Sequence, residues 1–158
     1  MKIQDLFEKW NLAGLKVKTP IMDMEWKPSD PDRDAAWDLY VELLTRITTQ
    51  SLPKEHGVEL TALESVHDLF KITRNTLKEH GRSCIEFTRI AVIVLNQVVR
   101  PFTAKWHKLS QNNGFESEEL CKEFRSDLEG LQVKLRNYTK LLAELANVED
   151  LTEVEAEQ

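Results

Sequence analysis

The chain has 158 residues, of which 41% are hydrophobic and 30% are charged. These values are typical of one soluble globular domain that is large enough to bury a core. The formal net charge is −6, which excludes the strongly basic character of a dedicated nucleic-acid-binding domain.

The first 31 residues predict a short helix followed by an extended arm. Four apolar residues at helical spacing place the helix at about residues 3–12; they are Ile3, Leu6, Phe7 and Trp10. The prolines and the brief apolar alternation of residues 14–32 favour an arm with at most one short edge strand. The N-terminal helix is amphipathic and contains acids, so it does not have the pattern of a signal peptide.

Three core helices are expected next. They span about residues 33–51, 58–80 and 83–108. Asp30 or Asp32 is expected to cap the first of them. The second ends in basic residues followed by Gly81, the usual C-terminal signal of a helix.

The third core helix contains the most apolar stretch of the chain, from Ile90 to Val99, which carries no charge. Residues that are apolar on every side predict a helix surrounded by others, at the centre of a bundle. Aspartate in place of Ile93 or Leu95 is therefore expected to prevent folding. Pro101 cannot donate a backbone hydrogen bond and is expected to bend the helix.

The C-terminal helix, residues 117–147, begins at the capping residue Ser117 and has a heptad pattern. Its apolar residues alternate at spacings of four and three: Phe124, Leu128, Leu131, Leu135, Tyr138, Leu142 and Leu145. The other helices are expected to cover only the early part of this seam. Its far end is then expected to be an exposed apolar strip through which two copies form a homodimer. This strip consists of Tyr138, Leu141, Leu142 and Leu145.

The prediction is an all-α, single-domain helical bundle formed by residues 1–147. Residues 1–31 form the N-terminal helix and arm, and residues 32–108 contain the core helices. Residues 148–158, with five acids and no base, are expected to be a flexible tail. The apolar run is half of the about 20 residues that cross a bilayer, so a cytoplasmic protein without membrane contact is expected.

The chain shows no pattern typical of a cofactor or a metal site. It lacks a glycine-rich phosphate loop, a dinucleotide fingerprint and a paired-histidine zinc motif. Glu64 and His67 form one Glu-x-x-His motif, but a di-iron bundle needs two such motifs and further carboxylates. His67, between Leu63 and Phe70, is therefore interpreted as a partly buried structural histidine.

An anion-binding candidate lies at the end of the third core helix: Arg100, Lys105, Trp106 and His107. The bases would hold an anion, and the indole would offer a stacking face. Residues 82–108 carry five bases and one acid, which supports nucleic acid as a partner only weakly. In the alternative interpretation, Phe102 and Trp106 complete the core and the bases are solvated at the helix end.

A seven-residue motif, RNTLKEH, runs from Arg74 to His80. It resembles the Arg-x(4–6)-His signature of HEPN-domain ribonucleases, including the polar residue, here Asn75, that this family favours after the arginine. HEPN domains are all-α bundles of about this size. The resemblance implies metal-independent RNA cleavage across a dimer, with arginine and histidine in both subunits. In such a site a guanidinium holds the phosphate and an imidazole moves protons.

Two functions from different classes follow from these patterns. The favoured one is a non-catalytic helical module for protein–protein interaction or oligomerisation, because the heptad seam is long and no catalytic set is assembled. A second copy of the chain and a protein partner are the expected ligands, and no cofactor is expected. The alternative is a HEPN-like ribonuclease that uses Arg74 and His80.

Overall fold

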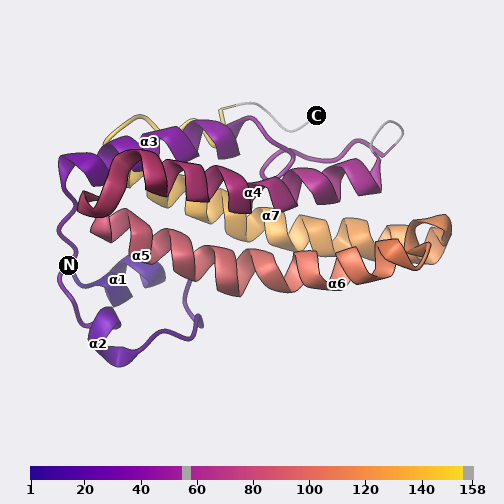
Figure 1. Ribbon diagram of the computed structural model, residues 1–158, viewed down its shortest axis with the longest axis horizontal. Coiled ribbons are helices and arrows are strands. Elements are labelled where there is room, and N and C mark those ends of the chain that lie inside the picture. The colour runs from indigo at the N-terminus through magenta and orange to yellow at the C-terminus, as the bar shows by residue number, and fades with distance from the viewer. Residues whose placement is uncertain (55–57, 155–158) are drawn as a thin grey trace.

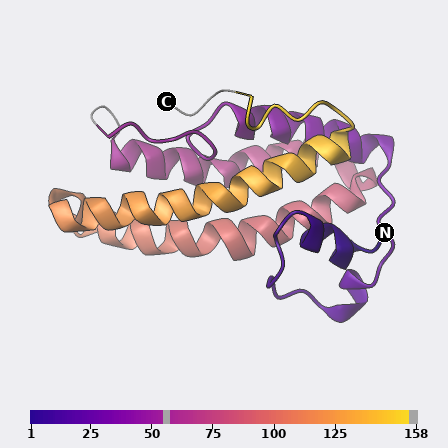
Figure 2. The ribbon, with the colours of Figure 1, turned by 180° about the vertical axis from the view of Figure 1, so that it is seen from behind.

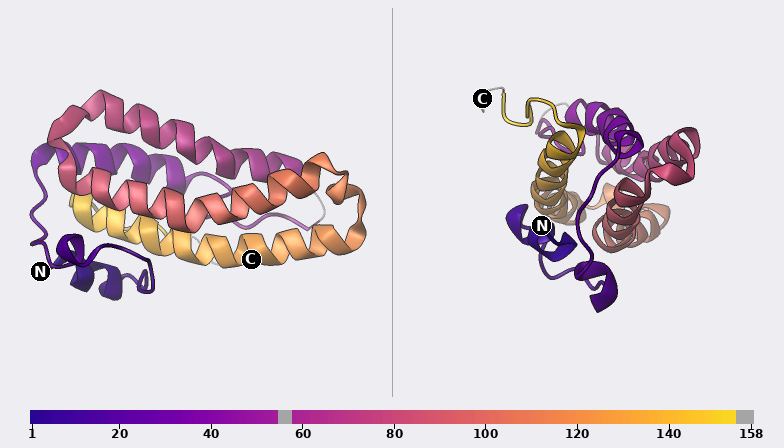
Figure 3. Two further views of the ribbon diagram at one scale, coloured as in Figure 1. Left: turned by 60° about the horizontal axis from the view of Figure 1, so that its bottom comes forward. Right: turned by 90° about the vertical axis from the view of Figure 1, so that its left-hand side faces the viewer.

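The computed structural model describes residues 1–54 and 58–154, and it confirms an all-α, single-domain helical bundle (Figure 1). The long helical segments are α3 (Asp30–Leu44), α4 (Glu59–His80), α5 (Ile85–Val94) continued by α6 (Arg100–Gln111), and α7 (Glu118–Ala146). The turns η1 (Gly81–Ser83) and η3 (Gly114–Glu116) connect α4 to α5 and α6 to α7. Successive segments run antiparallel (Figure 1), and the end-on view in Figure 3 shows them arranged around one core. Within the described ranges, no helix is both long and apolar enough to span a membrane.

The N-terminal segment covers one end of the bundle, where α7 ends (Figure 2). Helix α1 (Ile3–Lys9) buries the predicted apolar residues Ile3, Leu6 and Phe7. Its C-terminal end is attached to α7, because Lys9 Nζ and Trp10 Nε1 both donate to the carboxylate of Glu144, at 2.7 and 2.6 Å.

The arm that follows differs in detail from the prediction. It contains a short helix, α2 (Thr19–Met22). The part of the chain that is described contains no β-strand, and in place of the expected edge strand there is one antiparallel bridge between Lys2 and Glu25.

Helix α3 begins at Asp30, with Ser29 as its N-cap in place of the expected Asp30 or Asp32, and so starts before the predicted residue 33. It ends at Leu44, several residues before the predicted end at residue 51. The side chains of Thr49 and Gln50 turn back and donate to the carbonyls of Leu43 and Leu44, at 2.6 and 3.0 Å. These bonds satisfy carbonyls that a longer helix would use internally. Gln132 of α7 holds the turn in place by donating to the carbonyls of residues 47 and 50.

Helices α5 and α6 form one continuous helix, joined by a π-helical turn, η2 (Leu95–Val99). In this turn the amide of Arg100 donates to the carbonyl of Leu95, five residues earlier. In a regular α-helix the ring of Pro101 would clash with the carbonyl of Gln97. The wider turn immediately before the proline relieves that clash.

The helix formed by α5 and α6 does not lie at the centre of the bundle, contrary to the prediction. Val92 is 42% exposed, and Ile93 and Leu95 are only partly buried. The inward face is formed by other residues of the apolar stretch: Ile90, Ala91, Val94, Val98 and Val99. Each long helix occupies one side of the core, so the apolar stretch still has an outer face.

The predicted apolar strip on α7 is buried, so the expectation that it projects from the bundle is wrong. Tyr138, Leu141, Leu142 and Leu145 are at most 4% exposed. The chain reverses after α6, so that α7 runs back along the whole bundle (Figure 1). Its C-terminal half therefore reaches the end where α3 begins and packs against α3. The end of α1 is bound there through Glu144. The residues through which two copies were predicted to pair are therefore not on the surface of the protein.

Residues 148–154 contact the bundle, although a free tail was expected. The hydroxyl of Tyr40 donates to the carbonyl of Glu149 at 3.3 Å and accepts from the amide of Leu151 at 2.8 Å. Lys140 of α7 forms an ion pair with Glu153 at 2.7 Å. Residues 155–158 of the predicted tail lie outside the described residues.

Replacing Tyr40 with phenylalanine is expected to release this segment from the bundle. The ring stays buried, but the two hydrogen bonds to the tail are lost, which costs about 1 kcal/mol. Hydrogen exchange followed by NMR should show faster exchange of the Leu151 amide and unchanged amides in α3. Tyr138→Phe is the matched control, because the Tyr138 hydroxyl is buried without a hydrogen-bond partner in the described structure. Slow exchange at Leu151 in both variants would show that other contacts hold the tail.

Candidate functional site

The candidate site is a groove between α4 and α6, which lie side by side in the bundle. It has a volume of about 220 Å³. The α4 side contributes His67, Phe70 and Arg74, and the α6 side contributes Arg100, Thr103, Ala104 and His107. The groove thus combines two arginines and two histidines from two rigid helices.

Arg100 is held in the groove by contacts that leave its charge uncompensated. Its Nε and one terminal nitrogen donate to the side-chain oxygen of Asn96, at 3.2 and 3.1 Å. Its guanidinium lies 4.7 Å from the centre of the Phe70 ring, within cation–π distance. Both contacts orient the guanidinium, and neither neutralises it. Among the described residues, no carboxylate forms an ion pair with Arg100.

Arg74 faces Arg100 across the groove and is exposed. It has no hydrogen bond or ion pair with any described residue. Lys71 and Lys78 occupy the same stripe of α4, because they are three residues before and four residues after Arg74. Both lysines are exposed and have no ion-pair partner in the described ranges. This face of the protein is therefore basic, although the chain as a whole is acidic.

The two histidines of the groove contact each other. The rings of His67 and His107 meet edge to face, with their centres 4.7 Å apart. Burial lowers the pKa of His107 and the neighbouring His67 lowers it further, while Glu64 on α4 opposes both effects. His67 is exposed, so its interpretation as a partly buried structural histidine is wrong. It faces across to α6 rather than into the core.

The structure divides the predicted anion-binding set between two faces of α6. Arg100 and His107 line the groove, whereas Lys105 and Trp106 point toward α7. Lys105 binds Asp127 at 2.7 Å and also Glu123, and the two contacts raise its pKa. The indole of Trp106 is fully buried and donates to Asp127 at 3.1 Å. It therefore offers no stacking face, and its place in the core is confirmed.

The residues of the ribonuclease-like motif do not form one site within the chain. Residues six apart on an α-helix are separated by about 120° around its axis. Arg74 accordingly faces α6, whereas Nε2 of His80 lies 2.5 Å from Oδ2 of Asp38 on α3. Asn75 is exposed beside Arg74.

Asp38, Glu79 and His80 form the one group of three metal-ligating side chains found among the described residues. Their ligand atoms lie within 4.8 Å of one another. The group has a single imidazole, which already contacts Asp38, and Glu79 is exposed. We assign the contact between His80 and Asp38 to the packing of α4 on α3.

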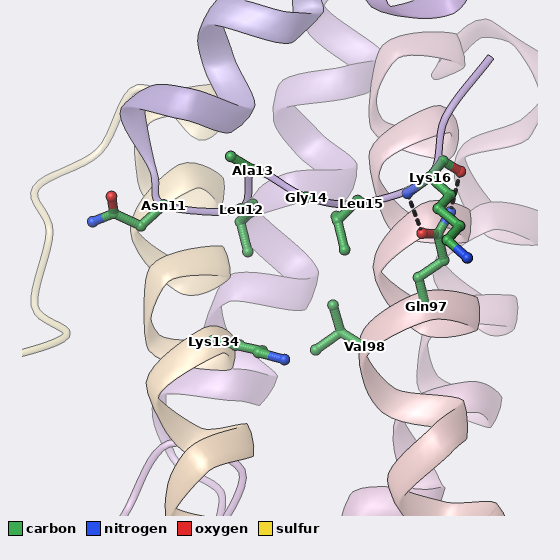
Figure 4. Close-up of a pocket in the computed structure, with 9 residues that line it drawn as sticks. All are labelled: Asn11, Leu12, Ala13, Gly14, Leu15, Lys16, Gln97, Val98 and Lys134. Carbon is green, nitrogen blue, oxygen red and sulfur yellow. Dashed lines mark hydrogen bonds between the residues drawn. The ribbon is translucent and has the colours of Figure 1, made fainter.

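A larger cavity, of about 400 Å³, lies between the N-terminal arm and the π-helical turn (Figure 4). Gln97 attaches the arm there: its side-chain oxygen accepts from the amide of Lys16 and its nitrogen donates to the carbonyl of Lys16, both at 2.6 Å. Lys134 of α7 points into the cavity. Lys16 and Lys134 are the charged residues that line this cavity, and no described arginine, histidine or carboxylate lines it with them, so it is a weaker candidate than the groove.

Sequence reasoning missed the contribution of α4 to the site. His67, Lys71, Arg74 and Lys78 follow the helical spacing of four, three and four residues, so their common stripe is readable from the sequence. Arg100 and His107 are seven residues apart and share a face of α6 in the same way. The sequence contains no signal that these two stripes face each other.

Comparison of the chain with protein-family models, curated proteins and solved structures found no match. The assignment of the site therefore rests on its own residues and their geometry.

Proposed function

We propose that the protein is a non-catalytic interaction module whose α4–α6 groove binds an acidic segment of a protein partner. The proposal rests on one observation about Arg100. Asn96 and Phe70 hold its guanidinium in a fixed orientation, and neither of them neutralises its charge. A preoriented guanidinium without a carboxylate partner is suited to receive one from outside the chain.

The surroundings of the groove support an extended acidic ligand. Lys71 and Lys78, with Arg74 between them, are seven residues apart on α4, or about 10 Å along the helix at 1.5 Å per residue. A segment with several acids along its length can therefore pair with successive bases. Such complementarity increases the association rate and selects for partners of opposite charge.

Nucleic acid fits the groove less well than an acidic peptide does. Phe70 is 5% exposed and Arg100 covers its ring, so Phe70 has no free face on which a base could stack. The indole of Trp106, which the sequence suggested for this purpose, is buried on the other side of α6.

The proposal predicts that a fluorescently labelled hexaglutamate peptide binds the protein and that Arg74→Gln and Arg100→Gln each weaken the binding about tenfold or more. A hydrogen bond between charged groups contributes about 1.5–3 kcal/mol, which corresponds to at least this factor. Fluorescence anisotropy at low ionic strength measures the affinity, and added salt should weaken it.

Arg82→Gln is the matched control, because Arg82 is exposed on the turn η1 and does not line the groove. It removes the same charge and should leave the affinity nearly unchanged. Thermal melting of each variant checks that the fold is intact. Equal weakening by all three substitutions would mean that the peptide responds only to net charge and would refute the groove as the binding site.

A further inference from the structure

The groove contains more donors than a single carboxylate can use. Arg74 of α4 and Arg100 of α6 line it together with His67 and His107, whose imidazole rings contact each other. One arginine side chain alone can match both oxygens of a carboxylate. A phosphorylated side chain presents three terminal oxygens and a charge of about −1.5 to −2 at neutral pH, so it can engage both arginines and a histidine at once.

We propose that the anionic group received by this groove is a phosphorylated side chain of the protein partner, held by Arg74 and Arg100, and that His107 takes up a proton when the phosphate binds. This inference rests on the proposed function and names the ligand class of the same site. It requires no bond to form or break other than the transfer of one proton from the buffer to an imidazole nitrogen.

The charged groups that face His107 explain why binding and protonation are coupled. In the free protein, burial and His67 lower the pKa of His107, and Glu64 raises it by less. Arg74 and Arg100 line the same groove as His107. His107 is therefore mostly neutral near its ordinary pKa of 6.5. A bound dianion outweighs these effects and raises the pKa.

The sign of the pH dependence follows from this shift. Between the lower pKa of the free protein and the higher pKa of the complex, the complex holds more protons than its separated components. The affinity for a dianion should therefore increase as the pH falls through this interval. A carboxylate, with one negative charge, should raise the pKa less and show a smaller dependence.

The test uses three nine-residue peptides of glycine and glutamate that differ only at the central position, which is phosphoserine, glutamate or serine. Isothermal titration calorimetry at pH 6.5, in PIPES and in Bis-Tris, gives the affinity and the number of protons exchanged, because the two buffers differ in their enthalpy of ionisation. We expect the phosphoserine peptide to bind at least tenfold more tightly than the glutamate peptide, with net proton uptake by His107.

His107→Gln isolates the contribution of the histidine, since the titration of the phosphate itself is the same in both proteins. It should reduce proton uptake with the phosphoserine peptide, whereas His80→Gln, outside the groove, should not. Equal affinities of the glutamate and phosphoserine peptides would overturn the phosphate assignment and leave the proposed function standing. Unchanged uptake in His107→Gln would overturn the role of His107.

Two further outcomes concern the ligand class as a whole. Failure of all three peptides and of hexaglutamate to bind would refute the proposed function together with this inference. A ten-residue oligothymidylate that binds more tightly than the phosphoserine peptide, and that loses affinity in Arg74→Gln, would show that the groove receives a nucleic-acid phosphate instead and would overturn the protein-partner assignment.

Discussion

Ile90→Asp is expected to prevent folding. Ile90 lies on the inward face of α5 with no exposed surface. An isolated carboxylate at this position would lose its hydration without gaining a partner, and this cost exceeds the about 5–15 kcal/mol by which domains are usually stable. Circular dichroism and size-exclusion chromatography of the purified variant should show a loss of cooperative thermal unfolding.

Val92→Asp is the matched control for this prediction. Val92 lies two residues away on the same helix and is 42% exposed, so its aspartate remains solvated. The free energy of unfolding should change by no more than about 0.5 kcal/mol. If Val92→Asp also fails to fold, or if Ile90→Asp melts at the wild-type temperature, the inward face of α5 has been assigned wrongly.

Asp32→Ala is expected to destabilise the protein by about 2–4 kcal/mol, because one buried carboxylate serves the beginnings of two helices. Oδ2 of Asp32 accepts from the amide of Ser29 at 2.8 Å and from its hydroxyl at 2.9 Å, at the start of α3. Oδ1 accepts from the amide of Phe87 at 3.0 Å, in the first turn of α5. Alanine would leave these donors unsatisfied, and Asp32 is only 1% exposed.

Urea denaturation gives the free energy of unfolding for this variant and its controls. Asp30→Ala removes the same charge from the same helical turn, but Asp30 is exposed. Its cost should be limited to the interaction with the helix dipole, about 0.3–1 kcal/mol. Asp32→Asn keeps one acceptor oxygen, so its loss of unfolding free energy should lie between those of Asp30→Ala and Asp32→Ala. Equal destabilisation by Asp30→Ala and Asp32→Ala would show that the stability depends on the negative charge at the start of α3, and not on the hydrogen bonds that Asp32 makes to α3 and α5.

The groove shows that the net charge of a chain does not describe every face of the folded protein. Lys105 and Arg46 are neutralised by acids on their own or neighbouring helices. Arg74 and Arg100 have no such partner among the described residues. An acidic protein can thus present a basic face, because packing determines which charges are compensated internally.

The sequence by itself determined the long helices and the boundaries of two of them. The predicted spans 58–80 and 117–147 agree with α4 (Glu59–His80) and α7 (Glu118–Ala146) to within one residue at each end. These signals are local: apolar periodicity, the cap at Ser117 and the glycine after His80 act within a few residues of the chain. The core position of Trp106, one of the two alternatives for that residue, was also readable in this way.

Only the tertiary structure decided where α3 ends, which face of each helix is buried and which bases share a site. The end of α3 depends on Gln132, more than 80 residues away along the chain. The far end of the seam on α7 is buried because the chain reverses and brings α3 against it. Arg74 and Arg100 belong to one groove only because α4 packs beside α6. Periodicity gives the apolar stripe of one helix, but the pairing of stripes depends on the packing of all the helices together.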